Sequence, residues 1–321
     1  MTARRHLAAL FAAAVLGTML ISPARSQTLT KVKISYVPGI GNLSFFVADA
    51  KGYFKAEGLE FEGLPINTGP GVASAVASNS ADVGYGGTLP TIAARSEGIP
   101  FKFVVGGYYE QVPTFSDSVI IASNKSGINS VADLKGKTIA VNNAGGVNDL
   151  QVRLKLKEAG IPIDSVKMLA IPFPQMQAAL EIGNADAVGT VDPFSTSILQ
   201  NKLGKVIARG YVQQKDLSKP IPVAAFYATE QWIGANRETL ARLKRAIEKA
   251  DEYIAANPVQ AKELLVQRLK FPGPLAAAIT LPPFSTKMDP ATVQAVIDAA
   301  LSVGILTKQM QAEEVLAPGL N

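Results

Sequence analysis

Apolar and polar residues alternate with a period of two in short stretches that are separated by segments with helical spacing. The stretch from Lys31 to Val37 is rich in Val, Ile and Tyr and therefore predicts a strand. The same pattern predicts further strands at 59–66, 81–86, 101–108, 118–123, 138–141, 166–171, 185–191, 205–209 and 222–229. Helices are predicted between them near 43–56, 71–79, 89–97, 147–159, 174–183 and 194–202. This alternation favours an α/β fold with parallel sheets and crossover helices.

Beyond residue 229 the pattern becomes helical. Asn236 is predicted to cap a long helix, Pro258 to start a second one, and residues 290–303 to form a third after a Pro-rich loop at 272–283. Thr88 is likewise predicted to cap the helix at 89–97. The charges of the late helices are mixed in sign, so we expect a solvated outer layer there rather than a binding site.

A strand followed by a Gly-containing loop and a helix start occurs twice. Pro38, Gly39 and Gly41 interrupt the chain after the first strand, and Gly145 and Gly146 do so after the strand at 138–141. Helix starts leave backbone N–H groups unpaired at the C-terminal end of a sheet, where small ligands and above all anions bind. Two such loops predict two lobes that face each other across a cleft.

The two halves match at an offset of 104 residues. Lys33 aligns with Lys137, and Asp82 aligns with Asp186. In both halves an Ala-rich helix ends in a small polar turn, and Ala-Asp opens the next strand. We interpret this as an internal duplication, and we expect both aspartates to be structural turn residues.

The first 26 residues have the order of a secretory signal peptide. Arg4 and Arg5 precede an uncharged run from Leu7 to Ile21, and Ala24-Arg25-Ser26 is a small-residue cleavage site. The run is shorter than the roughly 20 residues that span a bilayer, and no Cys follows that could carry a lipid. Removal of the predicted signal peptide, which contains three arginines and no acidic residue, would leave 28 basic and 26 acidic residues and a net charge of +2.

Several classes of function lack the residues that they need. The chain has no Cys, and its one His is His6, inside the predicted signal. Catalytic Ser-His-Asp and Cys-His arrangements are therefore excluded, as are ordinary zinc, copper and haem sites. We expect no catalytic residues, no metal and no cofactor. No basic stripe is present, which argues against nucleic-acid binding.

Five segments follow one another in a recognisable order: AKGYFKAEGLEFE (50–62), SADVGYGGTLPTIAARSEG (80–98), VADLKGKTIAV (131–141), AALEIGNADAVGTVDPF (178–194) and KADEYIAANPVQA (249–261). Together they resemble the substrate-binding proteins of ABC importers of the nitrate, sulfonate and taurine type. The resemblance covers nearly the whole mature chain and rests on the order and spacing of these segments together. It implies a two-lobed periplasmic-binding-protein fold of type II, in which two crossing strands join two α/β lobes.

The resemblance also implies a division of the chain and a role for it. Residues 27–117 and 226–321 form the first lobe and residues 118–225 the second, with hinges near Asp117–Ser118 and Ala225–Phe226. The protein is expected to be a periplasmic monomer that binds no nucleic acid, closes over a small ligand and delivers it to an ABC permease in the inner membrane. Sulfonates, taurine, nitrate, aromatic carboxylates and pyrimidines are the implied ligand types.

The resemblance further implies that loops at the C-terminal ends of strands line the cleft and bind the ligand. The predicted ligand-binding residues are Gly41, Asn42, Leu43, Thr68, Gly69, Gly87, Thr88 and Tyr108 in the first lobe, and Asn142, Gly145, Gly146, Val147, Asn148, Gln175, Asp192 and Phe194 in the second. Helix starts from both lobes would point backbone donors at one spot. The Asn and Thr side chains add neutral hydrogen bonds, and Tyr108 and Phe194 offer apolar contact.

For several of these residues the sequence leaves a structural role equally open. In that structural role, Gly41, Gly145 and Gly146 would simply permit turns of the backbone. Asn142 and Asn148 would cap a strand end and a helix, and Phe194 would belong to the hydrophobic core. Asp192 can accept from a ligand amine, but we favour a cap on its own helix. No Arg falls in a predicted cleft loop, which weakens the case for a fully charged anion and keeps aromatic, pyrimidine-like and zwitterionic ligands open.

Two other functions remain as alternatives. A secreted enzyme on this fold would depend on carboxylates, Lys, Tyr and hydroxyls, yet no pair of acids is prominent in the cleft loops. A ligand-sensing domain shares the fold, but the predicted signal and the lack of a DNA-binding segment argue against it. Binding for transport is the function that the sequence favours.

Overall fold

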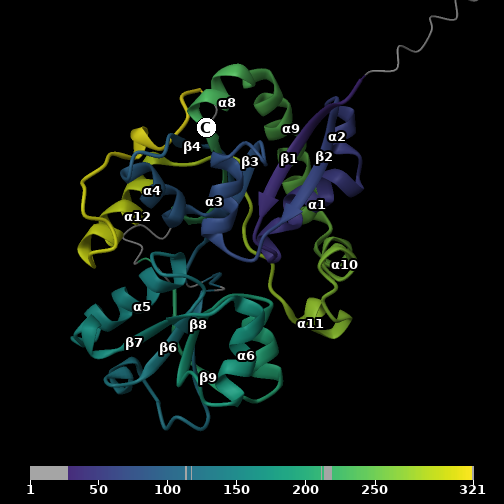
Figure 1. Cartoon of the computed structure of the whole chain (residues 1–321). Helices are drawn as coiled ribbons and strands as arrows, with labels where there is room; N and C mark the ends of the chain where they lie inside the picture. Colours follow the sequence, from purple (N-terminus) through teal and green to yellow (C-terminus); the bar gives the residue numbers. More distant parts are fainter. Residues whose placement is uncertain (1–27, 113, 117, 211, 213–218, 320–321) are drawn as a thin grey trace, which may run out of the picture.

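The computed structural model describes residues 28–112, 114–116, 118–210, 212 and 219–319, which form two five-stranded sheets one above the other (Figure 1). The first sheet has the order β2-β1-β3-β10-β4 and the second the order β7-β6-β8-β5-β9. Their bounds are β1 (Thr30–Tyr36), β2 (Leu59–Pro65), β3 (Val83–Gly87), β4 (Phe101–Glu110), β10 (Ile221–Thr229), β5 (Val119–Ser123), β6 (Thr138–Val141), β7 (Lys167–Ala170), β8 (Ala187–Thr190) and β9 (Gly204–Arg209). Each predicted strand is present. The predicted signal peptide lies outside the described residues.

Neither sheet is wholly parallel. β1 runs parallel to β2 and β3, but β10 is antiparallel to both of its neighbours, β3 and β4. In the second sheet β6 is parallel to β7 and β8, whereas β5 is antiparallel to β8 and β9. β5 and β10 are the strands that follow the two crossings between the sheets. The chain enters each sheet there from the end that faces the other lobe, so the entering strand runs the opposite way.

The second crossing lies earlier in the chain than predicted. β10 pairs within the first sheet from Ile221 onward, where Ile221 is opposite Glu110 and Ala224 is opposite Gly87. A division at Ala225–Phe226 would cut this strand in the middle, so the predicted hinge there is wrong. The chain passes between the sheets after Arg209 and before Ile221. Of the other predicted hinge, Ser118 directly precedes β5, and Asp117 is outside the described residues.

Helices cover both faces of each sheet. They are α1 (Leu43–Ala50), α2 (Tyr53–Ala56), α3 (Gly69–Ala77) and α4 (Thr88–Ser96), then α5 (Val147–Glu158), α6 (Phe173–Glu181) and α7 (Phe194–Gln200), and finally α8 (Glu230–Ala235), α9 (Arg237–Ala256), α10 (Pro258–Leu269), α11 (Gly273–Ala278) and α12 (Pro290–Ser302). The helix predicted at 43–56 is divided, because Gly52 takes a φ of +72°. Helices α8 and α11 were not predicted, and α11 falls within the Pro-rich loop.

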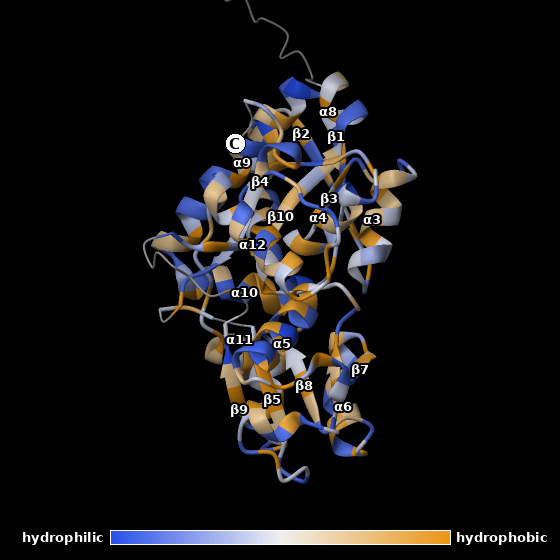
Figure 2. Ribbon diagram, turned by 90° about the vertical axis from the view of Figure 1, so that its left-hand side faces the viewer, coloured by the Kyte–Doolittle hydropathy of each residue, from blue (hydrophilic) through white to orange (hydrophobic). Residues whose placement is uncertain are grey.

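The core of the first lobe is aromatic and draws on the late helices. The Phe45 ring lies 5.4 Å from Tyr85 and 6.1 Å from Phe226, which joins α1, β3 and β10. One face of α9 is buried in the same core, with Leu240, Leu243, Ala246, Ile247, Ala250 and Ile254. The expectation that the late helices are only a solvated outer layer is therefore wrong for α9. Figure 2 shows hydrophobic residues on β5 and β9, and the buried ones of the second sheet lie on β5, β6 and β8.

The two aspartates of the predicted duplication make the same contacts. Asp82 accepts a hydrogen bond from Lys33 N and Asp186 accepts one from Thr138 N, both at 2.8 Å. Each carboxylate thus ties the start of one strand to its neighbour, which confirms the structural role. The counterpart of Lys33 is therefore Thr138 rather than Lys137, so the offset differs by one residue between the two landmarks.

Of two predicted helix caps, one is wrong and one is correct in position only. Thr88 is the first residue of α4 rather than its cap, and its hydroxyl donates to Pro222 O at 2.9 Å. Asn236 occupies the N-cap position of α9, but its side chain makes no capping hydrogen bond and donates to Trp232 O instead. In both cases a nearby backbone carbonyl competes for the side chain that the sequence pattern assigned to the helix start.

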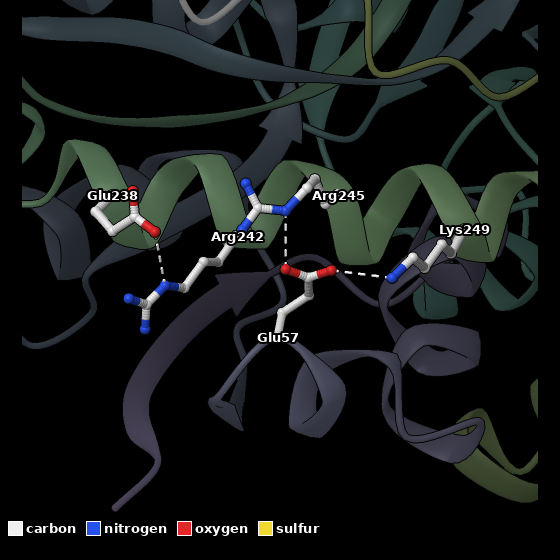
Figure 3. Close-up of polar contacts among 5 residues, drawn as sticks. All are labelled: Glu57, Glu238, Arg242, Arg245 and Lys249. Carbon is white, nitrogen blue, oxygen red and sulfur yellow. Dashed lines mark hydrogen bonds and ion pairs between the residues drawn. The ribbon is translucent and has the colours of Figure 1, made fainter. Parts of the chain in front are cut away.

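Glu57 joins α2 to α9 through two ion pairs. Its carboxylate accepts from Arg245 Nε at 2.8 Å and from Lys249 Nζ at 2.9 Å, and its side chain is only 12% exposed (Figure 3). Hydrogen bonds from Lys249 and Arg245 hold the pKa of Glu57 below its usual value. The two ion pairs therefore stabilise the folded protein fully at a pH above the pKa that Glu57 has in the unfolded chain. This stabilisation is lost as the pH falls through the lowered pKa of Glu57 in the folded protein.

We expect Glu57→Gln to lower the free energy of unfolding by about 1 kcal/mol, since one partly buried carboxylate serves two cations. The matched control is Glu238→Gln, which removes the exposed pair of Glu238 with Arg242 inside α9 (Figure 3) and should cost about 0.5 kcal/mol or less. Urea unfolding of both variants measures the difference. Equal losses would show that Glu57 adds nothing by bridging two helices.

Candidate functional site

A cavity lies between the two sheets, at the ends of strands from both. The space inside it that water can reach measures about 110 Å³, so in this conformation the cavity admits only a small molecule. The residues that line it are Val37, Pro38, Gly39, Ile40, Gly41, Asn42, Gly69, Tyr85, Gly86, Gly87, Pro90, Tyr108, Val223 and Ala224 from the first lobe, and Asn142, Asn143, Gly146, Val147, Asn148, Phe173, Val191 and Asp192 from the second.

The loop after β1 forms one wall of the cavity. Residues Ile40–Asn42 make a 3-10 turn, and the Asn42 side chain accepts from Gly39 N at 2.7 Å. Asn42 is buried, so its amide shapes the turn from inside. A Cβ on Gly41 would lie 2.6 Å from the Tyr108 ring and 2.8 Å from Tyr85 Oη. Glycine is therefore required at 41 because the loop passes directly against these two rings.

Three helices begin at the cavity. α3 starts at Gly69, α4 follows Gly87, and α5 follows Gly146, and each of these glycines lines the space. The first N–H groups of a helix have no partner within the helix, and they carry partial positive charge. Starts from both lobes therefore present hydrogen-bond donors to the same cavity.

Amide side chains of the second lobe add polar groups. Asn148 Nδ2 donates to Thr190 O at 3.4 Å, which holds this side chain against β8. Asn142 is 9% exposed, and its Nδ2 has no hydrogen-bond partner among the described residues. A buried amide donor without a partner costs free energy, so a ligand acceptor at this position would satisfy it.

Asp192 caps the helix that follows it. Its Oδ1 accepts from Thr196 N at 3.1 Å and from Thr196 Oγ1 at 2.6 Å, and it also accepts from the Ser195 hydroxyl. The capping role that the sequence favoured is confirmed. Asp192 also lines the cavity, so its carboxylate gives this wall a negative charge.

The cavity has aromatic walls, and the described residues that line it include no side-chain cation. Tyr85, Tyr108 and Phe173 line it, and within the described part of the chain none of the lining residues is Lys or Arg. Phe194 lies behind Phe173, with the two rings stacked 5.6 Å apart at 15°. The site thus combines flat apolar surface, backbone donors, amides and one carboxylate.

The structure brings ten of the sixteen predicted residues to the cavity and places six away from it. Those that line it are Gly41, Asn42, Gly69, Gly87, Tyr108, Asn142, Gly146, Val147, Asn148 and Asp192. Leu43 is fully buried in the first core, and the Thr68 hydroxyl caps α3 by accepting from Gly71 N.

The other residues outside the lining also have structural surroundings. Thr88 faces Pro222 O, and Phe194 supports Phe173 from behind. Gly145 has a φ of +68°, and its N–H donates to Asp149. Gln175 is exposed on α6. These placements do not support a direct ligand contact for the six residues.

Twelve lining residues were not predicted: Val37, Pro38, Gly39, Ile40, Tyr85, Gly86, Pro90, Asn143, Phe173, Val191, Val223 and Ala224. Most of them flank predicted positions and could have been found by widening each loop. Val223 and Ala224 had no such signal, because β10 was read as a crossing strand. Its antiparallel place between β3 and β4 brings it to the cavity.

The described residues contain no cluster of His, Cys, Asp and Glu that could hold a metal ion. Among the same residues, no helix combines the length and the apolar character needed to cross a bilayer.

The fold is that of the periplasmic binding proteins. The structure of the alkanesulfonate-binding protein SsuA from Xanthomonas axonopodis pv. citri bound to MOPS superposes with a TM-score of 0.76 at 21% identity, covering 90% of this chain and 98% of that one. The periplasmic aliphatic sulphonate binding protein SsuA from Escherichia coli gives a TM-score of 0.73 at 20% identity and covers 89% and 97%.

The chain belongs to the NMT1/THI5-like family, whose model matches residues 42–261. A protein of Brucella abortus whose name describes it only as a candidate binding protein is 29% identical over 257 residues, 79% of this chain and 76% of its own length. The nitrate/nitrite binding protein NrtA of Nostoc is 23% identical over 241 residues, 70% of this chain and 54% of its own length. These relatives are named as binding proteins rather than as enzymes.

Proposed function

We propose that this chain is an extracytoplasmic solute-binding protein that holds a small ligand between its lobes and delivers it to an ABC importer. The cavity carries this proposal: both lobes line it, and helix starts of both lobes face it. The names of the relatives support the class. Export of a monomer to the periplasm by the predicted signal peptide completes the proposal. The ligand leaves chemically unchanged, since binding alone is required.

We further propose that the ligand carries no uncompensated negative charge. The cavity offers a carboxylate at Asp192 and no Lys or Arg among its described lining residues, whereas anions such as sulfonates are commonly held by guanidinium groups. A flat molecule fits the rings of Tyr108 and Phe173. Hydrogen-bond acceptors would face Asn142 and the helix starts, and a donor or amine would face Asp192. Heteroaromatic and zwitterionic compounds, including pyrimidines and taurine, meet these conditions better than nitrate or simple alkanesulfonates.

A thermal-shift screen of refolded, ligand-free protein (residues 27–321) tests both proposals. The panel holds pyrimidines, taurine, aromatic carboxylates, alkanesulfonates, nitrate and bicarbonate. A ligand at about a thousand times its Kd adds roughly 4 kcal/mol of stability, which raises Tm by several degrees. We expect the largest shift from a neutral, zwitterionic or cationic compound. A shift from nitrate or an alkanesulfonate alone would keep the binding function and contradict the ligand charge, and a flat response across the panel would count against binding.

A further inference from the structure

Gln151 is fully buried in the second turn of α5, at the point where the chain leaves the second sheet. Its Nε2 donates to Ser118 O at 2.6 Å and lies 3.3 Å from Gly210 O. Ser118 directly precedes β5, and Gly210 directly follows β9. One side-chain amide therefore binds both segments that connect the lobes.

The two connecting segments are also bonded to each other at this point. Gly210 N donates to Ser118 O at 3.1 Å and lies 3.0 Å from Ser116 Oγ. Their regular pairing ends one residue away, where Val119 is opposite Arg209. The Gln151 amide thus sits at the last hydrogen-bonded position before the two segments leave the second sheet, which is where a hinge motion would bend the chain.

The same helix reaches the cavity at one end and the first lobe along its side. Asn148, one turn earlier, lines the cavity, and its Nδ2 lies 3.5 Å from Gln151 Oε1. Leu150 packs in the hydrophobic core of the first lobe, and Lys157 Nζ donates to Ser302 O at the end of α12. α5 therefore contacts the ligand cavity, the opposite lobe and, through Gln151, both connections.

We propose that Gln151 is a positioning residue that sets the angle between the lobes by fixing both connecting segments to α5. Any buried donor could satisfy the carbonyl groups of Ser118 and Gly210. The donor here belongs to α5, which also packs against the first lobe. Loss of the Gln151 hydrogen bonds would therefore let the two connecting segments move relative to the contact between α5 and the first lobe. The inference rests on the proposed function for its purpose, because closure over a ligand is what a set angle would serve.

The distance between the lobes in ligand-free protein tests this inference without knowledge of the ligand. The chain has no Cys, so exposed Gln200 on α7 and exposed Glu263 on α10 can each be replaced by Cys and spin-labelled cleanly. Pulsed electron resonance then gives the distance distribution. We expect one narrow peak for the labelled parent. In Gln151→Met we expect a second, longer distance, as an open state that is normally populated at about 10% or less becomes visible.

The control is Gln177→Met, because the Gln177 side chain accepts from Ser197 Oγ and Asn201 Nδ2 within the second lobe alone. Its distribution should match that of the parent. A distribution for Gln151→Met that also matches the parent would overturn the proposal. So would equal broadening in both variants, since that would show general loosening of the lobe.

Gln151→Glu is a second variant that retains the shape of the side chain. When the introduced carboxyl is ionised it cannot donate to Ser118 O, and when it is protonated it can. We expect the longer distance at high pH and its loss at low pH, with a parent distribution that stays unchanged over the same range. A distribution for this variant that does not change with pH, in a folded protein, would contradict a role for the donated hydrogen bond. These distance measurements use ligand-free protein, so they can be made and interpreted even if the thermal-shift screen finds no ligand.

Discussion

Replacement of Asp251 by Asn is expected to remove a loss of stability that the unmodified protein shows between about pH 4, near the unfolded-state pKa, and about pH 8, above the folded-state pKa. Asp251 is largely buried on α9, where Ser44 Oγ donates to its Oδ1 at 2.5 Å and its Oδ2 has no partner among the described residues. Burial, opposed by the Ser44 hydrogen bond and assisted by the charges of Glu248 and Glu252, raises the pKa of Asp251 to about 7 from a usual 3.8.

The sign of the effect follows from the protons bound by each state. Between these two pKa values the folded protein keeps the proton of Asp251 and the unfolded chain has lost it. The free energy of unfolding therefore falls as the pH rises, by about 1.4 kcal/mol per pH unit, and levels off above the folded-state pKa. From about pH 5 upward the total loss is roughly 2–3 kcal/mol.

Urea unfolding of the unmodified protein and of Asp251→Asn across this pH range measures the effect. We expect the variant to be the more stable protein at about pH 8, because it buries a neutral amide in place of a charge. The control is Glu252→Gln, which removes the exposed neighbouring acid and should keep the pH slope. Parallel curves for the unmodified protein and Asp251→Asn would contradict the prediction.

Gly87→Ala is expected to weaken ligand binding by propping the lobes apart. A Cβ on Gly87 would lie 3.0 Å from Val147 Cγ2 in the opposite lobe and 3.4 Å from Pro90 Cδ. The backbone angles of Gly87, φ −54° and ψ 138°, suit alanine, so the strain arises between the lobes rather than within the loop. Overpacking of this kind costs about 1–3 kcal/mol, which corresponds to a loss of affinity of roughly 5- to 150-fold.

Gly234→Ala on α8 is the control, because an added Cβ there would meet no heavy atom within 4 Å and Gly234 does not line the cavity. Titration calorimetry with the compound that gives the largest thermal shift measures both affinities. We expect Gly234→Ala to bind like the unmodified protein. Equal affinities for Gly87→Ala and Gly234→Ala would show that the lobes do not close on Val147 during binding.

The strands were predictable because each carries its own local pattern. Period-two alternation at Lys31–Val37 and the turn glycines that follow it are properties of consecutive residues, and β1 begins and ends within one residue of the prediction. Tyr108 and Asn142 were predicted as site residues from the family resemblance and the repeated loop. Tyr108 lies near the end of β4 and Asn142 directly follows β6, at the edge where parallel strands present their C-terminal ends. The family followed from the order of segments, which is also written along the chain.

Errors occurred where distant backbone groups decided the outcome. The Thr88 hydroxyl binds Pro222 O, 134 residues away, and no local rule could anticipate that competitor. The apolar sequence of β10 does not indicate which sheet the strand joins, and the strand was therefore predicted to form the crossing between the lobes. Its antiparallel pairing with β3 and β4 also brought Val223 and Ala224 to the cavity unforeseen.

By itself the sequence determined the α/β alternation, the glycine loops at the helix starts, the absence of Cys and His from residues 27–321, and the family. All of these depend on residue type and on spacing between near neighbours. Only the tertiary structure decided that β10 belongs to the first sheet, that Asp251 lies within hydrogen-bond distance of Ser44, and that Gln151 binds both connecting segments. Such features depend on which atoms meet across long sequence separations, and that is settled by the packing of whole elements against one another.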